Sequence, residues 1–168
     1  MSITTRTTGL LLVLVGLGVG LGTGVGCEPA ELDCGPTEAV VERVIDGDTV
    51  QLATGERVRY LLIDTPEVSE PVECYGPEAT DFNRTMVEGQ TVQLTYDEEC
   101  TDRYGRLLAY VEVDGRSVNE LLLSRGFACV LHIPPNGADR VDEYRRLEEK
   151  AQVGQVGLWG ACPEDACD

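Results

Sequence analysis

The sequence is short of positive charge, of histidine and of the cysteine spacings that bind zinc. Its 168 residues include 13 Lys and Arg against 30 Asp and Glu, a net charge of −17. Such a surface repels phosphates, which argues against non-specific electrostatic binding of nucleic acid over the whole molecule. A local basic cleft, or a cation that bridges carboxylates to phosphate, stays compatible with this charge. His132 is the only histidine and no Cys-x-x-Cys pair occurs, which argues against a zinc site.

The first 27 residues differ in composition from the rest of the chain. Arg6 is the only charged residue before Cys27, and an uncharged, largely apolar run follows it. This order is typical of an export signal, with an uncleaved membrane anchor as the alternative. Cys27 directly follows small residues, which resembles a bacterial lipoprotein signal. We therefore expect residues 1–27 to direct export, either to the cell envelope with a lipid on Cys27 or to the medium as a secreted protein.

The cysteines fit an oxidising compartment. The chain has seven, so six remain if Cys27 is lipidated, and an even number favours disulfides. Their pairing does not follow from the count. We expect a Pro- and acid-rich tether over 28–38, a folded domain over 39–161 and a cysteine-containing tail over 162–168.

Hydrophobic periodicity predicts the elements of that domain. Alternating and β-branched runs predict strands over 40–44, 49–52, 57–63, 91–96 and 107–113. Helical spacing predicts helices from Pro77 to Gly89, from Ser117 to Arg125 and over 139–152. Ser117 and Glu120 form a capping box. This order predicts an α+β fold: a five-stranded, partly closed antiparallel barrel of the oligonucleotide-binding (OB) type with three helices.

Acidic residues stand at the ends of two predicted strands, where packing alone gives no reason for them. Asp48 begins one strand, with Asp46 close by, while Asp64 and Glu67 follow another. Carboxylates that converge repel one another unless something neutralises them. Because no histidine or cysteine accompanies them, a hard cation such as Ca²⁺ or Mg²⁺ is the natural partner.

Two arginines complete the pattern. Arg59 lies in the strand that leads to Asp64, and Arg106 begins the next strand run. Arginine beside carboxylates either pairs with them or binds phosphate through two parallel hydrogen bonds. A cation and arginines stabilise charge on phosphorus oxygens, and a carboxylate accepts a proton from water. Together these groups are those that phosphodiester hydrolysis needs.

The motifs VIDGDTVQL (44–52), RYLLIDTPE (59–67), YGPEA (75–79), DRYGRLLAYV (102–111), VNELLLSRGFA (118–128) and GLWG (157–160) occur in one chain in this order. In these motifs the chain, from about residue 39 to 160, resembles the staphylococcal nuclease (thermonuclease) family. The resemblance implies an OB-fold barrel with helices that cuts DNA and RNA with Ca²⁺ and leaves 3′-phosphate ends.

The resemblance also implies a metal site. Asp48 and Asp64 match the calcium carboxylates, and Thr65 matches a residue that offers its backbone carbonyl. Asp46 matches a nearby outer carboxylate. Ca²⁺ is thus the expected cofactor.

Further positions match substrate and catalytic groups of that family. Glu67 matches the general base, and Arg59 and Arg106 match the arginines that bind phosphate. Arg103 and Tyr104 match positions that line the nucleotide pocket.

Two segments depart from the family pattern. His132 and Pro134, in the loop HIPPNG, stand where tyrosines flank the base, and the segment 67–75 is shorter and has lost its lysines. Base preference and affinity are therefore expected to differ.

With the resemblance in place, the cysteine positions gain meaning. Cys74 and Cys100 precede loops that should border the cleft, so we expect a Cys74–Cys100 disulfide that holds the loop of Arg106. A Cys162–Cys167 bridge is a further pairing.

The sequence thus predicts an exported, calcium-dependent nuclease that acts as a monomer on DNA, with RNA as a second substrate. One alternative is a non-catalytic nucleic-acid- or protein-binding module on the same barrel. Another is a calcium-binding structural lipoprotein of the cell surface.

Overall fold

Residues 33–162 are described in a computed structural model of the protein, and all belong to one structural unit. The expected export segment, the lipidation residue Cys27 and Cys167 lie outside the described residues. Within the described part, no helix is long and apolar enough to cross a bilayer.

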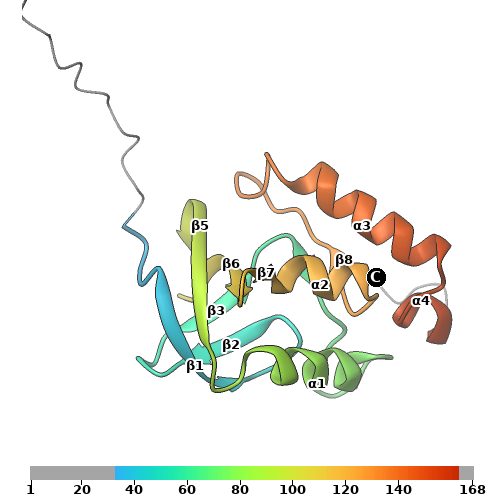
Figure 1. Cartoon of the computed structure of the whole chain (residues 1–168), viewed down its shortest axis with the longest axis horizontal. Helices are drawn as coiled ribbons and strands as arrows, with labels where there is room; N and C mark the ends of the chain where they lie inside the picture. Colours follow the sequence, from blue (N-terminus) through green and yellow to red (C-terminus); the bar gives the residue numbers. More distant parts are fainter. Residues whose placement is uncertain (1–32, 163–168) are drawn as a thin grey trace, which may run out of the picture. The chain divides into compact units, whose positions relative to one another are not determined.

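A barrel of β-strands forms the centre of the domain (Figure 1). Its strands are β1 (Glu38–Val44), β2 (Thr49–Leu52), β3 (Arg57–Tyr60), β5 (Thr91–Thr101) and β6 (Leu107–Val113). They follow the order β3-β2-β1-β5-β6, with β7 (Arg116–Ser117) added beside β6, and a β3–β6 pairing closes the sheet. The five-stranded barrel is confirmed, but β3 and β6 run parallel, so a wholly antiparallel barrel was wrong at this pair.

Alternation along the strands builds the core. Val50 and Leu52 of β2, Val58 and Tyr60 of β3, and Val41 of β1 are at most 1% exposed. Their neighbours along each strand face the opposite side, as the period of two requires. Burial of these side chains is the main favourable term for the barrel.

Helices cover the barrel. They are α1 (Gly76–Val87), α2 (Val118–Ser124), α3 (Val141–Val153) and the short α4 (Leu158–Ala161). In Figure 1, α1 packs on β1, α2 packs on β6, and α3 packs on α2. The predicted cap of α2 is confirmed, because the Ser117 hydroxyl accepts a hydrogen bond of 3.2 Å from the Glu120 N–H.

The run predicted as one strand over 57–63 is broken. After β3 the chain kinks at Leu62, whose φ is 63°, a rare value for a side chain of this size. It then forms β4 (Ile63–Asp64), which pairs with β8 (Cys129–Val130). The kink is supported because the Leu62 carbonyl accepts from the Leu131 N–H at 3.1 Å.

The disulfides differ from the predicted pairing. Cys34 pairs with Cys100 and Cys74 with Cys162, so the expected Cys74–Cys100 and Cys162–Cys167 bridges are wrong. Cys129 is disulfide-bonded as well. Pairing depends on which segments meet in space: the N-terminal end of the domain meets β5, and the C-terminal end meets the loop before α1.

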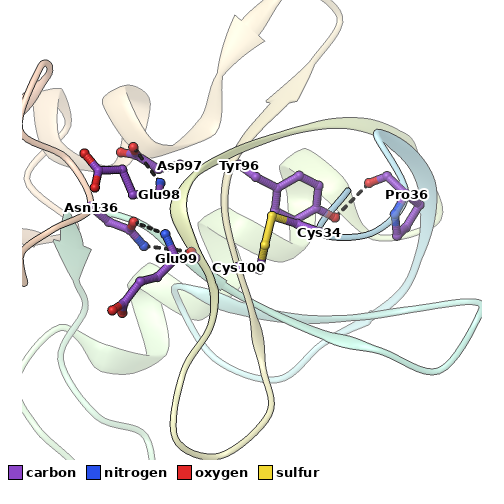
Figure 2. Close-up of a disulfide and its surroundings, with 8 residues drawn as sticks. All are labelled: Cys34, Pro36, Tyr96, Asp97, Glu98, Glu99, Cys100 and Asn136. Carbon is purple, nitrogen blue, oxygen red and sulfur yellow. Dashed lines mark hydrogen bonds between the residues drawn. A yellow bond between two sulfur atoms is a disulfide. The ribbon is translucent and has the colours of Figure 1, made fainter. Parts of the chain in front are cut away.

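Figure 2 shows how the N-terminal end of the domain attaches to β5. Beside the Cys34–Cys100 bridge, the Tyr96 hydroxyl donates to the Pro36 carbonyl at 2.8 Å. The Leu94 N–H of β5 also donates to the Thr37 carbonyl at 2.8 Å. The last residues of the expected tether, 34–38, therefore pack on the barrel.

Candidate phosphodiester-cleavage site

The turn between β1 and β2 carries the first pair of carboxylates. Its ends meet where the Ile45 N–H donates to the Thr49 carbonyl at 2.9 Å. Inside the turn, the Asp48 N–H donates to Asp46 Oδ1 at 3.1 Å. Asp48 is only 4% exposed. A carboxylate that is buried in this way needs hydrogen bonds or an ion pair.

Arg59 supplies that ion pair. The β2–β3 register places Thr49 opposite Arg59, and the Arg59 guanidinium reaches the neighbouring Asp48. Its Nη1 is 3.1 Å from Asp48 Oδ2, and its Nη2 is 2.5 Å from Asp64 Oδ1. Nη1 also donates to the carbonyl of Ile63 at 2.7 Å. One guanidinium therefore joins the two carboxylates.

Thr65 holds Asp48 from the other side. Its N–H and its hydroxyl donate to Asp48 Oδ2 at 2.8 and 3.1 Å. This approach requires a glycine in the turn, because a Cβ on Gly47 would lie 2.6 Å from Thr65 Oγ1. These hydrogen bonds hold the turn that contains Asp48 against the segment that contains Asp64.

A buried amide supports the turn from the core. Asn83 of α1 is fully buried, and its Nδ2 donates to the Asp46 carbonyl at 3.2 Å. Its Oδ1 accepts from the Tyr60 hydroxyl at 3.0 Å. Buried polar groups that are satisfied in this way hold one arrangement.

The acid cluster carries more negative charge than its arginine neutralises. Burial, with the nearby Asp48 carboxylate as a second cause, raises the pKa of Asp46 to about 6. Burial also raises the pKa of Asp64 to about 6; Arg59 opposes this rise, and Asp48, Glu67 and Glu73 add to it. A cation beside these groups would relieve the repulsion.

The groups in this cluster that could hold a cation are carboxylate oxygens. Between residues 33 and 162, no group of three or more His, Cys, Asp or Glu side chains is arranged to hold a metal. Asp48 and Asp64 nevertheless form a pair of carboxylates with only one guanidinium between them. Calcium binds hard oxygen ligands and completes its shell with carbonyls and water.

Arg106 lies in the hairpin between β5 and β6. The turn 102–106 closes through the Asp102 N–H, which donates to the Arg106 carbonyl at 3.0 Å, and Gly105 takes a φ of 74°. Asp102 Oδ2 accepts from Arg106 Nε at 2.6 Å, and Oδ1 accepts from the Arg106 N–H at 2.9 Å. The acid thus orients the guanidinium of Arg106.

Tyr104 stands at the tip of this hairpin between two arginines. The guanidinium carbons of Arg103 and Arg106 lie 4.7 and 5.7 Å from the centre of its ring. The Tyr104 side chain is 61% exposed, although its hydroxyl accepts from Arg103 at 2.6 Å. An exposed ring flanked by cations is suited to stack on a base.

A cavity of about 470 Å³ connects these groups, and Arg59, Arg103, Tyr104 and Arg106 line it. Its apolar wall includes Leu131 and Ile133 of the chain that follows β8. Ile133 is 66% exposed, so the wall opens to solvent. The structure therefore brings the predicted arginines and Tyr104 to one cavity beside the carboxylates.

Glu67 lies at the start of the loop that leads to α1. It is exposed, and its N–H donates to the Glu73 carboxylate at 2.8 Å. Its charge reaches Asp64, whose pKa it helps to raise. The predicted base therefore borders the acid cluster and belongs to a loop rather than to the barrel.

Sequence reasoning missed several supporting residues. Asp102 stands four residues before Arg106 in a turn that contains glycine, a pattern that could have indicated its role. Asn83 and Glu73 left no such signal, because their partners are distant in the chain or in an irregular loop. Base preference was expected to differ because of His132 and Pro134. Neither residue lines this cavity, whereas Leu131, Ile133 and Asn136 of the same segment do.

The chain is similar to several known proteins. The sequence profile described as "Staphylococcal nuclease homologue" matches residues 57–161. Endonuclease YncB of Bacillus subtilis (strain 168) is 40% identical over 126 residues, which cover 71% of this chain and 60% of that protein. The thermonuclease of Staphylococcus intermedius is 39% identical over 130 residues, 71% of this chain and 74% of that protein.

A third relative is longer. The SPbeta prophage-derived endonuclease YokF of Bacillus subtilis (strain 168) is 38% identical over 129 residues, 73% of this chain but 44% of that protein. The chain thus spans less than two thirds of the length of YokF and of YncB.

The fold and site define an OB-type barrel with an arginine-bridged carboxylate pair at the edge of an open cavity. The chain belongs to the staphylococcal nuclease family.

Proposed function

We propose that the protein is an exported, calcium-dependent nuclease that hydrolyses phosphodiester bonds of DNA, and of RNA as a second substrate, leaving 3′-phosphate ends. The observation that carries this proposal is the bridge from Arg59 to Asp48 and Asp64, beside a cavity that Arg106 also lines. Membership of the family adds support, since related proteins are named endonucleases and thermonucleases.

Asp48 and Asp64 would hold the calcium ion together with the Thr65 carbonyl. Asp46 would be a nearby outer carboxylate that does not bind the ion directly. When bound, Ca²⁺ supplies positive charge for the phosphate and the attacking water. The contacts of Thr65 with Asp48 and of Asn83 with the Asp46 carbonyl hold the ligands in place before the metal arrives. Such preorganisation lowers the cost of binding.

Glu67 would take a proton from the attacking water. Its exposure beside Asp64 lets water reach its carboxylate. Arg59 and Arg106 would donate hydrogen bonds to the phosphate oxygens, whose negative charge grows in the transition state. Because Asp102 holds the Nε of Arg106, the Nη groups of that guanidinium can still contact phosphate.

Tyr104 and Arg103 would contact the nucleotide next to the cleaved bond. Stacking on an exposed ring suits every base, so this contact binds without selecting a sequence. With a net charge of −17, the rest of the surface does not attract nucleic acid at long range. Binding therefore depends on this cluster of arginines and on the cation.

The disulfides between described residues support export, since such bonds persist in oxidising compartments. We propose that the protein acts as a monomer outside the cytoplasm, attached to the envelope by a lipid on Cys27 or secreted.

Cleavage of end-labelled single-stranded DNA and RNA by the oxidised protein, with Ca²⁺ or with EDTA, tests the proposal. We expect cleavage only with Ca²⁺ and products that resist 3′ extension until a phosphatase acts. Binding of DNA without cleavage in the presence of Ca²⁺ would contradict the proposal and favour a non-catalytic binding module. Calcium binding that nucleotides do not affect would favour a structural lipoprotein.

A further inference from the structure

The loop between Pro66 and Gly76 closes on itself at the residue proposed as the base. Glu67 and Glu73 make two reciprocal hydrogen bonds: the Glu67 N–H donates to Glu73 Oε2 at 2.8 Å, and the Glu73 N–H donates to the Glu67 carbonyl at 2.9 Å. Each bond uses the backbone of Glu67 and leaves its carboxylate free to project. Two bonds to one residue fix its orientation better than either bond alone.

The first residue of α1, Gly76, packs against the backbone of Glu67. A Cβ on Gly76 would lie 2.6 Å from the Glu67 carbonyl oxygen, so the helix backbone lies directly against Glu67. The Gly76 N–H also donates to the Glu73 carbonyl at 3.2 Å. The loop is thus closed against the first turn of the helix and is held at both ends.

A disulfide anchors this closure to the far end of the domain. Cys74 follows Glu73 directly and is bonded to Cys162, which comes just after α4. The disulfide joins the loop to the C-terminal helical segment, although the two cysteines are 88 residues apart in the sequence. The bond restrains Glu73, and through it Glu67, without contacting the cavity.

We propose that Glu73 is a positioning residue that holds Glu67 in its working orientation through their two reciprocal hydrogen bonds, which we call the clamp. We further propose that the Cys74–Cys162 disulfide keeps this clamp closed. The proposal rests on the proposed function, in which Glu67 accepts a proton. The part that Glu73 plays is that of a hydrogen-bond acceptor for the Glu67 N–H. Its negative charge is not required, and it also adds to the repulsion at Asp64.

Three glutamate variants of the oxidised full-length chain test the proposal. Glu73→Ala removes the acceptor, and misplacement of the base should lower kcat about tenfold with KM nearly unchanged. Glu73→Gln keeps an oxygen that can accept from the Glu67 N–H and should retain kcat close to that of the original protein. Glu70→Ala, at an exposed glutamate of the same loop, is the matched control and should leave kcat unchanged.

Amide hydrogen exchange at Glu67 gives a second readout that does not need activity. We expect protection in the original protein and in Glu73→Gln, and faster exchange in Glu73→Ala. The double variant Cys74→Ser with Cys162→Ser should also speed exchange at Glu67, whereas Cys34→Ser with Cys100→Ser should not.

The outcomes separate the clamp from the function. An inactive original protein with clamp-dependent exchange at Glu67 would refute the proposed function and keep the clamp. Equal exchange in Glu73→Ala and the original protein would overturn the clamp. A loss of kcat in Glu73→Gln as large as in Glu73→Ala would also overturn it, because the charge would then be the active feature.

Discussion

Arg59 and Asp48 form the most buried ion pair of the described part of the chain, with Nη1 3.1 Å from Oδ2 and side chains only 12% and 6% exposed. A charge at such depth depends on its partner, since removal of one member leaves the other unpaired in a poorly hydrated site. The pair is therefore both a structural element and half of the candidate site.

Replacement of Arg59 should harm stability and activity together. In Arg59→Ala, Asp48 stays buried without its cation, so we expect a loss of about 3 kcal/mol in unfolding free energy. Loss of a phosphate donor should lower kcat/KM at least about 100-fold. Arg59→Lys should recover only part of the stability and of the activity, because an ammonium group cannot bridge Asp48 and Asp64 as the planar guanidinium does. Arg116→Ala, in an exposed pair, is the control for chemical denaturation and kinetics.

Calcium should stabilise the folded protein through Asp48. A ligand that binds only the native state raises the midpoint of thermal unfolding. Asp48→Asn keeps an oxygen that can accept from Thr65 but removes the charge, so the shift with Ca²⁺ should disappear. Thermal scans with Ca²⁺ and with EDTA measure this effect. An equal shift in Asp48→Asn would locate the ion elsewhere.

The hairpin of Arg106 should weaken in acid. Burial raises the pKa of Asp102, but hydrogen bonds from the N–H and side chain of Arg106 and from the Tyr104 N–H outweigh it and hold this pKa below 3.8. A lowered pKa stabilises the fold at pH values above 3.8, and this contribution is lost as pH falls through the folded-state pKa.

Asp102→Asn tests this directly. Its stability should fall below that of the original protein at neutral pH, and the difference should shrink as the pH drops below 3.8. Urea unfolding across this range measures the difference. A difference that does not change with pH would mean that the ionised form of Asp102 contributes nothing.

The Cys34–Cys100 disulfide should support substrate binding. Cys100 lies near the end of β5, two residues before the turn 102–106 that carries Arg103, Tyr104 and Arg106, and Figure 2 shows the bridge beside Tyr96. Its loop has a sequence separation of 66 residues, so its removal should cost about 3 to 4 kcal/mol of stability. We expect Cys34→Ser with Cys100→Ser to raise KM more than it lowers kcat. Unchanged KM in the folded variant would show that the turn holds its shape without the bridge.

The acidic surface should give an uncommon salt response. Because the net charge is −17, moderate salt screens repulsion between protein and nucleic acid. Cleavage at low substrate concentration should therefore hold or rise between low and moderate salt. A steep fall, as for a basic protein, would mean that long-range attraction drives binding after all.

Local sequence patterns predicted most of the barrel and its helices. The strands around Val50 and Leu107 and the cap at Ser117 all follow from periodicity and turn chemistry, which act over a few residues. The parallel β3–β6 pairing and the kink at Leu62 did not follow, because they depend on contacts with distant segments. The disulfide pairing was wrong for the same reason.

The candidate site was predictable to the extent that its groups lie in contiguous motifs. The DGD turn and the segment Asp64–Glu67 were found in this way, and the structure joins Asp48, Arg59 and Asp64. Their metal-binding and catalytic roles stay predictions. Asn83 and Glu73 act through tertiary hydrogen bonds that no local pattern reveals.

The most direct test of the account is single-turnover cleavage of single-stranded DNA by the oxidised protein with Ca²⁺, beside Glu67→Gln and Arg106→Ala. We expect rapid cleavage that falls at least about 100-fold in each variant while both stay folded. Equal rates in the three proteins would contradict it, because the proton acceptor and the phosphate contact would then lie elsewhere.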